Sequence, residues 1–162
     1  MPISRTTPTA RAGQAAHLKD ETDLVSAVRN NTLPALSFYK PIGADNEHPG
    51  YANLLDGERN ATDPIQSIMS SPAWRNTAVI VTYDENGGFW DHVPPPLTDV
   101  WGPGTRVPTI VISPYAKKGF VDPTDYDTTP ILALIEHRYH LTPLGSRDAS
   151  AADLQNSVTF TH

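Results

Sequence analysis

Two carboxylates and a histidine stand close together in one stretch of the sequence. Asp84 and Glu85 follow the apolar run 78–81, and His92 comes shortly after them, beyond the pair of glycines at 87–88. Carboxylate oxygens are ligands that hard divalent cations prefer. An imidazole can donate, accept or transfer a proton near neutral pH. The stretch therefore predicts a metal site formed by Asp84 and Glu85, with His92 as a catalytic group beside it.

The same residues also fit a simple turn. Asn86 followed by Gly87 is a strong signal for a tight β-hairpin, and acids beside such turns are usually solvated. A hairpin does not need two acids before its turn and the Asp91-His92 pair after it. This excess of polar groups favours the functional interpretation, but the pattern alone leaves both open.

A second candidate is His48, within the polar stretch Asn-Glu-His-Pro-Gly at 46–50. This stretch follows a predicted strand at 33–39. Ligands of parallel sheets bind beyond the carboxyl ends of the strands, so parallel pairing would place His48 and Asp84 on one edge. His48 is then a candidate to contact an oxyanion or protonate a leaving group. The alternative is a polar turn that ends in Pro-Gly.

The elements that must position these residues alternate along the chain. Apolar stripes and capping residues predict three helices, and β-branched apolar runs predict three strands. The helices are expected at 20–31, 61–71 and 129–140, and the strands at 33–39, 77–83 and 106–113. This order predicts an α/β fold with a mostly parallel sheet flanked by helices. Residues 1–16 are polar and rich in Pro, Thr and Ala, so they predict a disordered tail before a single domain at 17–162.

Composition excludes several classes of function. A net charge of −6 over 162 residues argues against a nucleic-acid-binding surface, which would carry a basic patch. The sequence contains no apolar run long enough to predict a transmembrane helix. Cysteine is absent, which removes disulfides, thiolate metal sites and cysteine nucleophiles. His137 and His140 share a predicted helix with Glu136, but they do not form the H-E-x-x-H pattern of zinc peptidases.

Four longer motifs carry a family resemblance. They are DNEHPGY at 45–51, TYDENGGFWDHV at 82–93, GPGTRVP at 102–108 and ISPY at 112–115. Together they resemble the bacterial phosphoesterase family, which contains acid phosphatases and phospholipases C. The resemblance implies an alkaline-phosphatase-like α/β fold, of which this chain would be the C-terminal part.

The resemblance also implies a chemistry. It points to metal-dependent hydrolysis of phosphate monoesters, because the KPIG segment at 40–43 is similar to the acid phosphatase branch. Asp84 and Glu85 match the metal ligands of the family, and His48 and His92 match positions around the phosphate. The identity of the divalent metal ion stays open. The alternatives are a phospholipase C-type phosphodiester hydrolase and a non-catalytic remnant.

One departure from the family pattern is large. Members of the family carry a Glu-Asn metal-binding motif and a serine or threonine nucleophile in segments that precede the matched region, and no stretch of this sequence resembles either. The resemblance therefore implies a fragment whose activity depends on an N-terminal segment or on association with another chain. Family members are typically exported. Residues 1–16 lack the apolar core of a secretory signal, so the location of this chain stays open.

Overall fold

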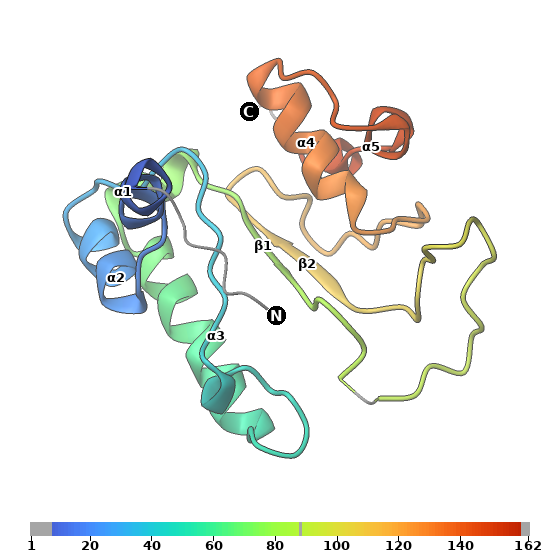
Figure 1. Ribbon diagram of the computed structural model, residues 1–162, viewed down its shortest axis with the longest axis horizontal. Coiled ribbons are helices and arrows are strands. Elements are labelled where there is room, and N and C mark those ends of the chain that lie inside the picture. Colours follow the sequence, from blue (N-terminus) through green and yellow to red (C-terminus); the bar gives the residue numbers. More distant parts are fainter. Residues whose placement is uncertain (1–7, 88, 160–162) are drawn as a thin grey trace. The chain divides into compact units, whose positions relative to one another are not determined.

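The computed structural model describes residues 8–87 and 89–159 (Figure 1). Two compact units make up the chain, Met1–Arg75 and Asn76–His162. The first unit is helical, and the second contains a small sheet and two further helices. In the described part of the chain, no helix is both long and apolar enough to cross a membrane. With its helices and its small sheet, the fold is of the α/β class that the sequence predicts.

Helices α1 and α2 begin the first unit. Helix α1, Pro8–His17, occupies much of the segment for which the sequence predicts a disordered tail, and 1–7 lie outside the described residues. Helix α2, Glu21–Arg29, confirms the helix predicted at 20–31. It begins with a capping box, because the Asp20 carboxylate accepts from the Asp23 N–H at 3.1 Å and the Asp23 carboxylate accepts from the Asp20 N–H at 3.2 Å.

Helix α3, Leu54–Met69, begins earlier than the helix predicted at 61–71. The start lies at Asn53, whose side-chain oxygen accepts from the Leu55 N–H at 2.9 Å. Pro64 therefore lies inside the helix and is buried there, and not in a first turn, where the missing N–H of a proline costs nothing. The predicted strand at 33–39 is wrong, since these residues form bends and irregular structure. This run contains Pro34, which has no N–H to donate to a sheet.

The sheet of the second unit has two strands, β1 (Val79–Thr82) and β2 (Thr109–Ile112). They pair antiparallel, with Val79 opposite Ile112 and Thr82 opposite Thr109. The parallel pairing predicted from the element order is therefore wrong for these strands. A parallel pair needs a crossover, usually a helix, whereas the connection at 83–108 is irregular throughout its described residues. The larger alkaline-phosphatase-like sheet stays a prediction.

Two helices complete the second unit: α4, Thr129–Tyr139, which confirms the helix predicted at 129–140, and the short α5, Ser146–Ser150 (Figure 1). A buried pair of carboxylates, Glu136 and Asp148, joins them to the turn between them. The Leu144 N–H donates to Asp148 at 2.6 Å and to Glu136 at 3.3 Å. The Gly145 N–H donates to Asp148 at 2.8 Å. Asp148 thus accepts from the N–H groups of both Leu144 and Gly145, whereas Glu136 accepts only the longer bond from Leu144.

This pair divides one proton unequally. Burial raises the pKa of Glu136, and the neighbouring Asp148 raises it further. Burial also acts to raise the pKa of Asp148, but the N–H groups of Leu144 and Gly145 and the contact with Glu136 outweigh it, so the pKa of Asp148 is lowered. The two shifts have opposite directions, so a proton shared by the pair lies on Glu136 rather than on Asp148.

Replacing Glu136 with glutamine should stabilise the chain in a pH-dependent way. An acid whose pKa is raised on folding contributes stability at low pH, and that contribution is lost as the pH rises through the folded pKa. Glutamine keeps the neutral form at every pH. The difference between the urea midpoints of Glu136→Gln and the unmodified chain should be near zero at about pH 4 and positive at about pH 7. A difference that stays the same at both pH values would contradict the shared proton.

Candidate functional site

The two predicted metal ligands follow the end of β1. Asp84 and Glu85 come immediately after Tyr83, and both are exposed. The Glu85 carboxylate accepts from the Gly87 N–H at 2.9 Å, and the Asn86 carbonyl accepts from the Phe89 N–H at 2.9 Å, which closes a turn. Gly87 has a φ of 59°, a conformation that glycine adopts without strain. The turn does not return directly into β2, so the tight-hairpin interpretation is wrong.

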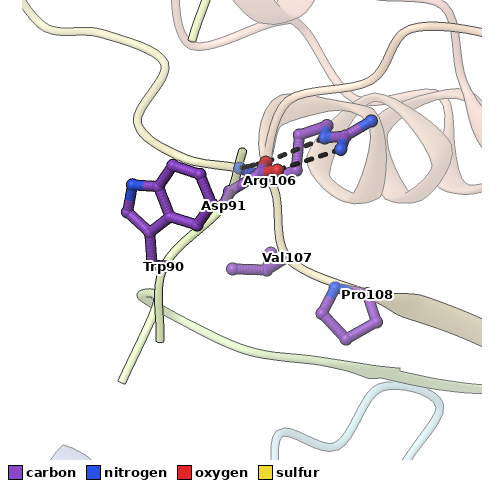
Figure 2. Close-up of a pocket in the computed structure, with 5 residues that line it drawn as sticks. All are labelled: Trp90, Asp91, Arg106, Val107 and Pro108. Carbon is purple, nitrogen blue, oxygen red and sulfur yellow. Dashed lines mark hydrogen bonds and ion pairs between the residues drawn. The ribbon is translucent and has the colours of Figure 1, made fainter. Parts of the chain in front are cut away.

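Asp91 anchors the far end of this segment. Its carboxylate makes a two-point ion pair with Arg106, from Nε to Oδ2 at 2.8 Å and from Nη2 to Oδ1 at 2.9 Å (Figure 2). The backbone N–H groups of Val93 and Arg106 donate to the same carboxylate at 3.0 and 3.3 Å. The carboxylate therefore has four donors, and it joins the start and the end of the connection between the strands.

Asp91 and Arg106 each stabilise the charged form of the other. The hydrogen bonds from Arg106 hold the pKa of Asp91 well below its ordinary value, and Asp91 raises the pKa of Arg106. An acid whose pKa is lowered on folding contributes stability above its unfolded pKa and loses it only as the pH falls through the folded value. The pair therefore stays charged across the mildly acidic range.

His92 lies beside this pair and faces solvent. Its Nδ1 is 3.8 Å from Asp91 Oδ1, and 76% of its side chain is exposed. The rings of Trp90 and His92 have centroids 6.4 Å apart. Trp90, Asp91 and Arg106 line an open hollow of about 410 Å³ together with Val107 and Pro108 (Figure 2). The four predicted site residues do not line this hollow.

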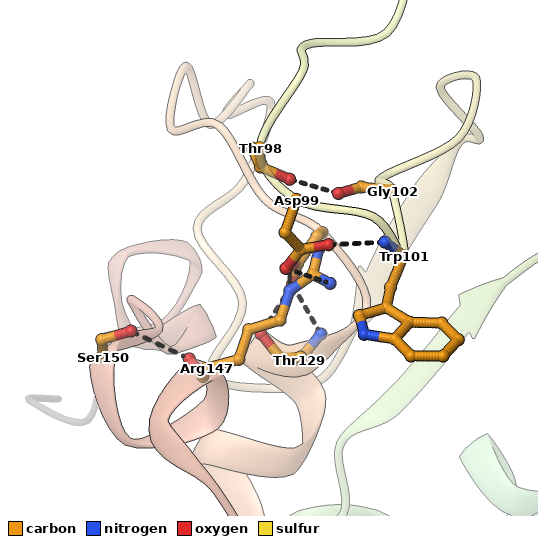
Figure 3. A network of polar contacts seen from close by, with 8 residues as sticks. Thr98, Asp99, Trp101, Gly102, Thr129, Arg147 and Ser150 are labelled. Atoms are coloured by element: carbon orange, nitrogen blue, oxygen red, sulfur yellow. Dashed lines mark hydrogen bonds and ion pairs between the residues drawn. The ribbon is translucent and has the colours of Figure 1, made fainter.

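A second arginine holds the tip of the same connection (Figure 3). Arg147 in α5 pairs with Asp99 at 3.5 Å and with Asp127 at 2.8 Å. Asp127 in turn accepts from the Thr129 N–H at 2.7 Å, at the start of α4. The Asp99 carboxylate accepts from the Trp101 N–H at 2.8 Å. Arg147 therefore ties the tip of the connection to the start of α4.

His48 lies in the first unit, in a loop fixed by local contacts. Its N–H donates to Asn46 Oδ1 at 3.0 Å, and its ring stacks on Tyr51 with centroids 4.6 Å apart. The preceding residue, Glu47, has a φ of 66° and packs against Gly57 of α3. The imidazole is exposed. Because His48 and His92 belong to different units, their common position on one sheet edge stays a prediction.

The donor set fits a metal ion in kind but is short in number. Asp84 and Glu85 offer the oxygen ligands of a hard cation, which takes about six to eight of them. In the ranges 8–87 and 89–159, His, Asp and Glu side chains do not form a group of three that could hold a metal ion. His137 of α4, which the sequence places near Glu136, contacts the Asp153 carboxylate at 2.6 Å. The two carboxylates would thus supply part of a metal shell.

Comparison with known proteins decides the family. The family described as the phosphoesterase family matches residues 3–142. The chain belongs to the phosphoesterase family. Its relatives include phospholipase C B of Mycobacterium tuberculosis (strain ATCC 25618 / H37Rv), which is 35% identical over 85% of this chain and 32% of the relative. Non-specific phospholipase C6 of Arabidopsis thaliana is 30% identical over 78% of this chain and 31% of the relative.

A third relative is the non-hemolytic phospholipase C of Burkholderia pseudomallei (strain K96243), which is 35% identical over 82% of this chain and 24% of the relative. The chain thus spans about a third or less of the length of these curated relatives. The phosphoesterase match includes all four predicted site residues, His48, Asp84, Glu85 and His92.

Sequence reasoning did not single out the side chains that hold the loop after β1. Asp91 and Arg106 lie within the motifs at 82–93 and 102–108, but the pattern indicates a role for neither, and Arg147 lies outside the four motifs. One signal was available: an acid near the start and an arginine near the end of a long connection between two strands. Such a pair is well placed to close the connection.

Two glycines in helices make a matched test of the loop that carries His48. A Cβ at Gly57 would lie 2.2 Å from Glu47 Cγ and 3.0 Å from the Glu47 backbone nitrogen, whereas a Cβ at Gly13 meets nothing within 4 Å. Gly13→Ala should raise the free energy of unfolding by roughly 0.5–1 kcal/mol, the usual gain in a helix. Gly57→Ala should lower it by about 1–3 kcal/mol, because the backbone of Glu47 must move.

The measurement is urea unfolding of both variants, with the His48 ring resonances followed by NMR. We expect a shift of these resonances in Gly57→Ala and none in Gly13→Ala. If both substitutions stabilise the chain equally, the close packing of Glu47 on α3 is wrong.

Proposed function

We propose that this chain forms part of an enzyme that hydrolyses phosphate esters, with phosphate monoesters as the substrate class. The observation that carries the proposal is the phosphoesterase match over 3–142, which includes the loop with Asp84, Glu85 and His92. Two exposed carboxylates directly after a strand support a cation site at that position. The relatives are named phospholipases C, which supports phosphate-ester chemistry in general.

In this proposal the two carboxylates and the two histidines have different roles. Asp84 and Glu85 hold a divalent cation through their carboxylate oxygens. Such a cation, when bound, neutralises charge on the phosphoryl oxygens and lowers the pKa of a coordinated hydroxyl. His92 and His48 contact the phosphoryl group or give a proton to the leaving alcohol, for which an exposed imidazole is accessible.

The nucleophile in this proposal is a serine or threonine supplied from outside these 162 residues. In the sequence, no serine lies in the G-x-S-x-G setting of a nucleophile elbow. The same proposal extends to the fold. Ile110 of β2 is 57% exposed, which fits a strand that packs within a larger alkaline-phosphatase-like sheet.

Phosphodiester hydrolysis of the phospholipase C type is the second candidate. The observation in its favour is that the relatives reported above are all named phospholipases C. Phosphate monoesters remain the first candidate because the KPIG segment at 40–43 is similar to the acid phosphatase branch of the family. Parallel assays with p-nitrophenyl phosphate and bis(p-nitrophenyl) phosphate separate the two candidates once the chain is combined with the protein that supplies the nucleophile.

With added divalent metal, the isolated chain should hydrolyse p-nitrophenyl phosphate no faster than its Asp84→Ala variant. The reason is that the members of a catalytic unit act together, so loss of the nucleophile removes several orders of magnitude of rate. Metal-dependent binding of inorganic phosphate should persist. It would appear as broadening of the phosphorus NMR line, which Asp84→Ala abolishes.

Asp125→Ala, which removes another exposed aspartate, is the matched control and should leave phosphate binding unchanged. Turnover that Asp84→Ala abolishes would support the hydrolase but place the nucleophile within this chain. If the chain shows neither turnover nor metal-dependent phosphate binding, its part in a phosphate-ester site is refuted.

A further inference from the structure

We propose that Asp91 and Arg106 form a positioning clamp for the loop that carries the site. The clamp holds 83–87 and the backbone at His92 in place, while its own side chains contact neither substrate nor metal. This inference rests on the proposed function for the importance of Asp84 and Glu85. The effect of the clamp on the order of the loop, however, does not require a bound metal ion.

The segment is closed at both of its ends. At the sheet, Thr82 pairs with Thr109, and their hydroxyl oxygens lie 2.9 Å apart. At the other end, Asp91 binds Arg106, which lies shortly before β2. Asp84 and Glu85 therefore lie inside a small closed ring rather than at the base of one long open loop.

Loop entropy gives this closure a consequence for the site. The freedom of a flexible loop rises with its length. Without the ion pair, Asp84 and Glu85 would lie in a longer loop, which extends to the contact of Asp99 with Arg147, and they would sample more arrangements. Binding of a cation by both carboxylates would then require the segment to become ordered. The free energy that this ordering costs would weaken the affinity for the cation.

The chemistry of the pair suits a clamp better than a reacting group. Arg106 presents two parallel N–H donors to one carboxylate, a geometry that fixes direction as well as distance. With the N–H groups of Val93 and Arg106, the Asp91 carboxylate has four donors. Both oxygens are thus engaged, and Asp91 aligns the backbone at His92 instead of exchanging a proton with its ring.

The test compares substitutions in the whole chain. Arg106→Ala removes the clamp, Arg106→Lys keeps the charge but loses the two-point contact, and Asp91→Arg together with Arg106→Asp reverses the pair. Arg59→Ala is the matched control, since Arg59 forms another exposed ion pair, with Asp56 at 3.2 Å in α3. Two properties are measured: backbone ¹⁵N order parameters, and the affinity for Mn²⁺ by electron paramagnetic resonance.

In Arg106→Ala the order parameters at Asp84, Glu85 and His92 should fall from about 0.85 to below about 0.6. The affinity for Mn²⁺ should weaken about fivefold, as expected when a short closed loop becomes a long one. The reversed pair should recover part of both losses, and Arg106→Lys should lie between. Signals of α4 should stay unchanged in every variant, and Arg59→Ala should match the unmodified chain.

The two hypotheses fail in different ways. Unchanged order parameters in Arg106→Ala would overturn the clamp, even if the chain binds Mn²⁺. Loss of the α4 signals in the same variant would also overturn it, because the pair would then be a general stabiliser. If order is lost at 84–85 while the unmodified chain binds no Mn²⁺, the clamp on the loop is supported and the metal site of the proposed function is refuted.

Discussion

The ion pair between Asp91 and Arg106 is the contact on which the site loop depends. Two short antiparallel strands are joined by the connection 83–108, whose described residues are irregular. Such a connection has little regular backbone pairing of its own, so side chains must give it shape. Asp91 does this near the strands, and Arg147 does it at the tip through Asp99 and Asp127. The residues proposed to do chemistry are thus held by residues that do none.

Polar contacts have this importance because little apolar surface is deeply buried. Among the described residues, the buried apolar side chains are few and include those of Val28, Ala133 and Leu154, while Ile110 and many aromatic residues are exposed. The buried acids Glu136 and Asp148 join α4, α5 and the turn between them, a role that apolar packing takes in larger cores.

Local signals predicted the helices better than the pairing of the strands. The apolar stripes and capping residues of α2 and α4 located those helices closely, because these signals act within one turn. The early start of α3 at Asn53 and the irregular segment at 33–39 depend on contacts outside the local pattern. Whether two strands pair parallel or antiparallel depends on the connection between them. The alternating element order suggested a crossover helix, but the described part of 83–108 contains none. The motifs contained the candidate residues and Arg106, but they indicated no role for Arg106 and did not include Arg147.

The most direct test of the account is paramagnetic mapping of Mn²⁺ on the ¹⁵N-labelled chain. We predict that low concentrations of Mn²⁺ broaden the amide signals of Asp84, Glu85 and Gly87 first, and those near His92 next. Asp84→Ala should abolish this order of broadening. Broadening centred instead on another acidic group, such as that around Asp122 and Asp153, or spread evenly over the exposed acids, would contradict the assignment of Asp84 and Glu85 as metal ligands.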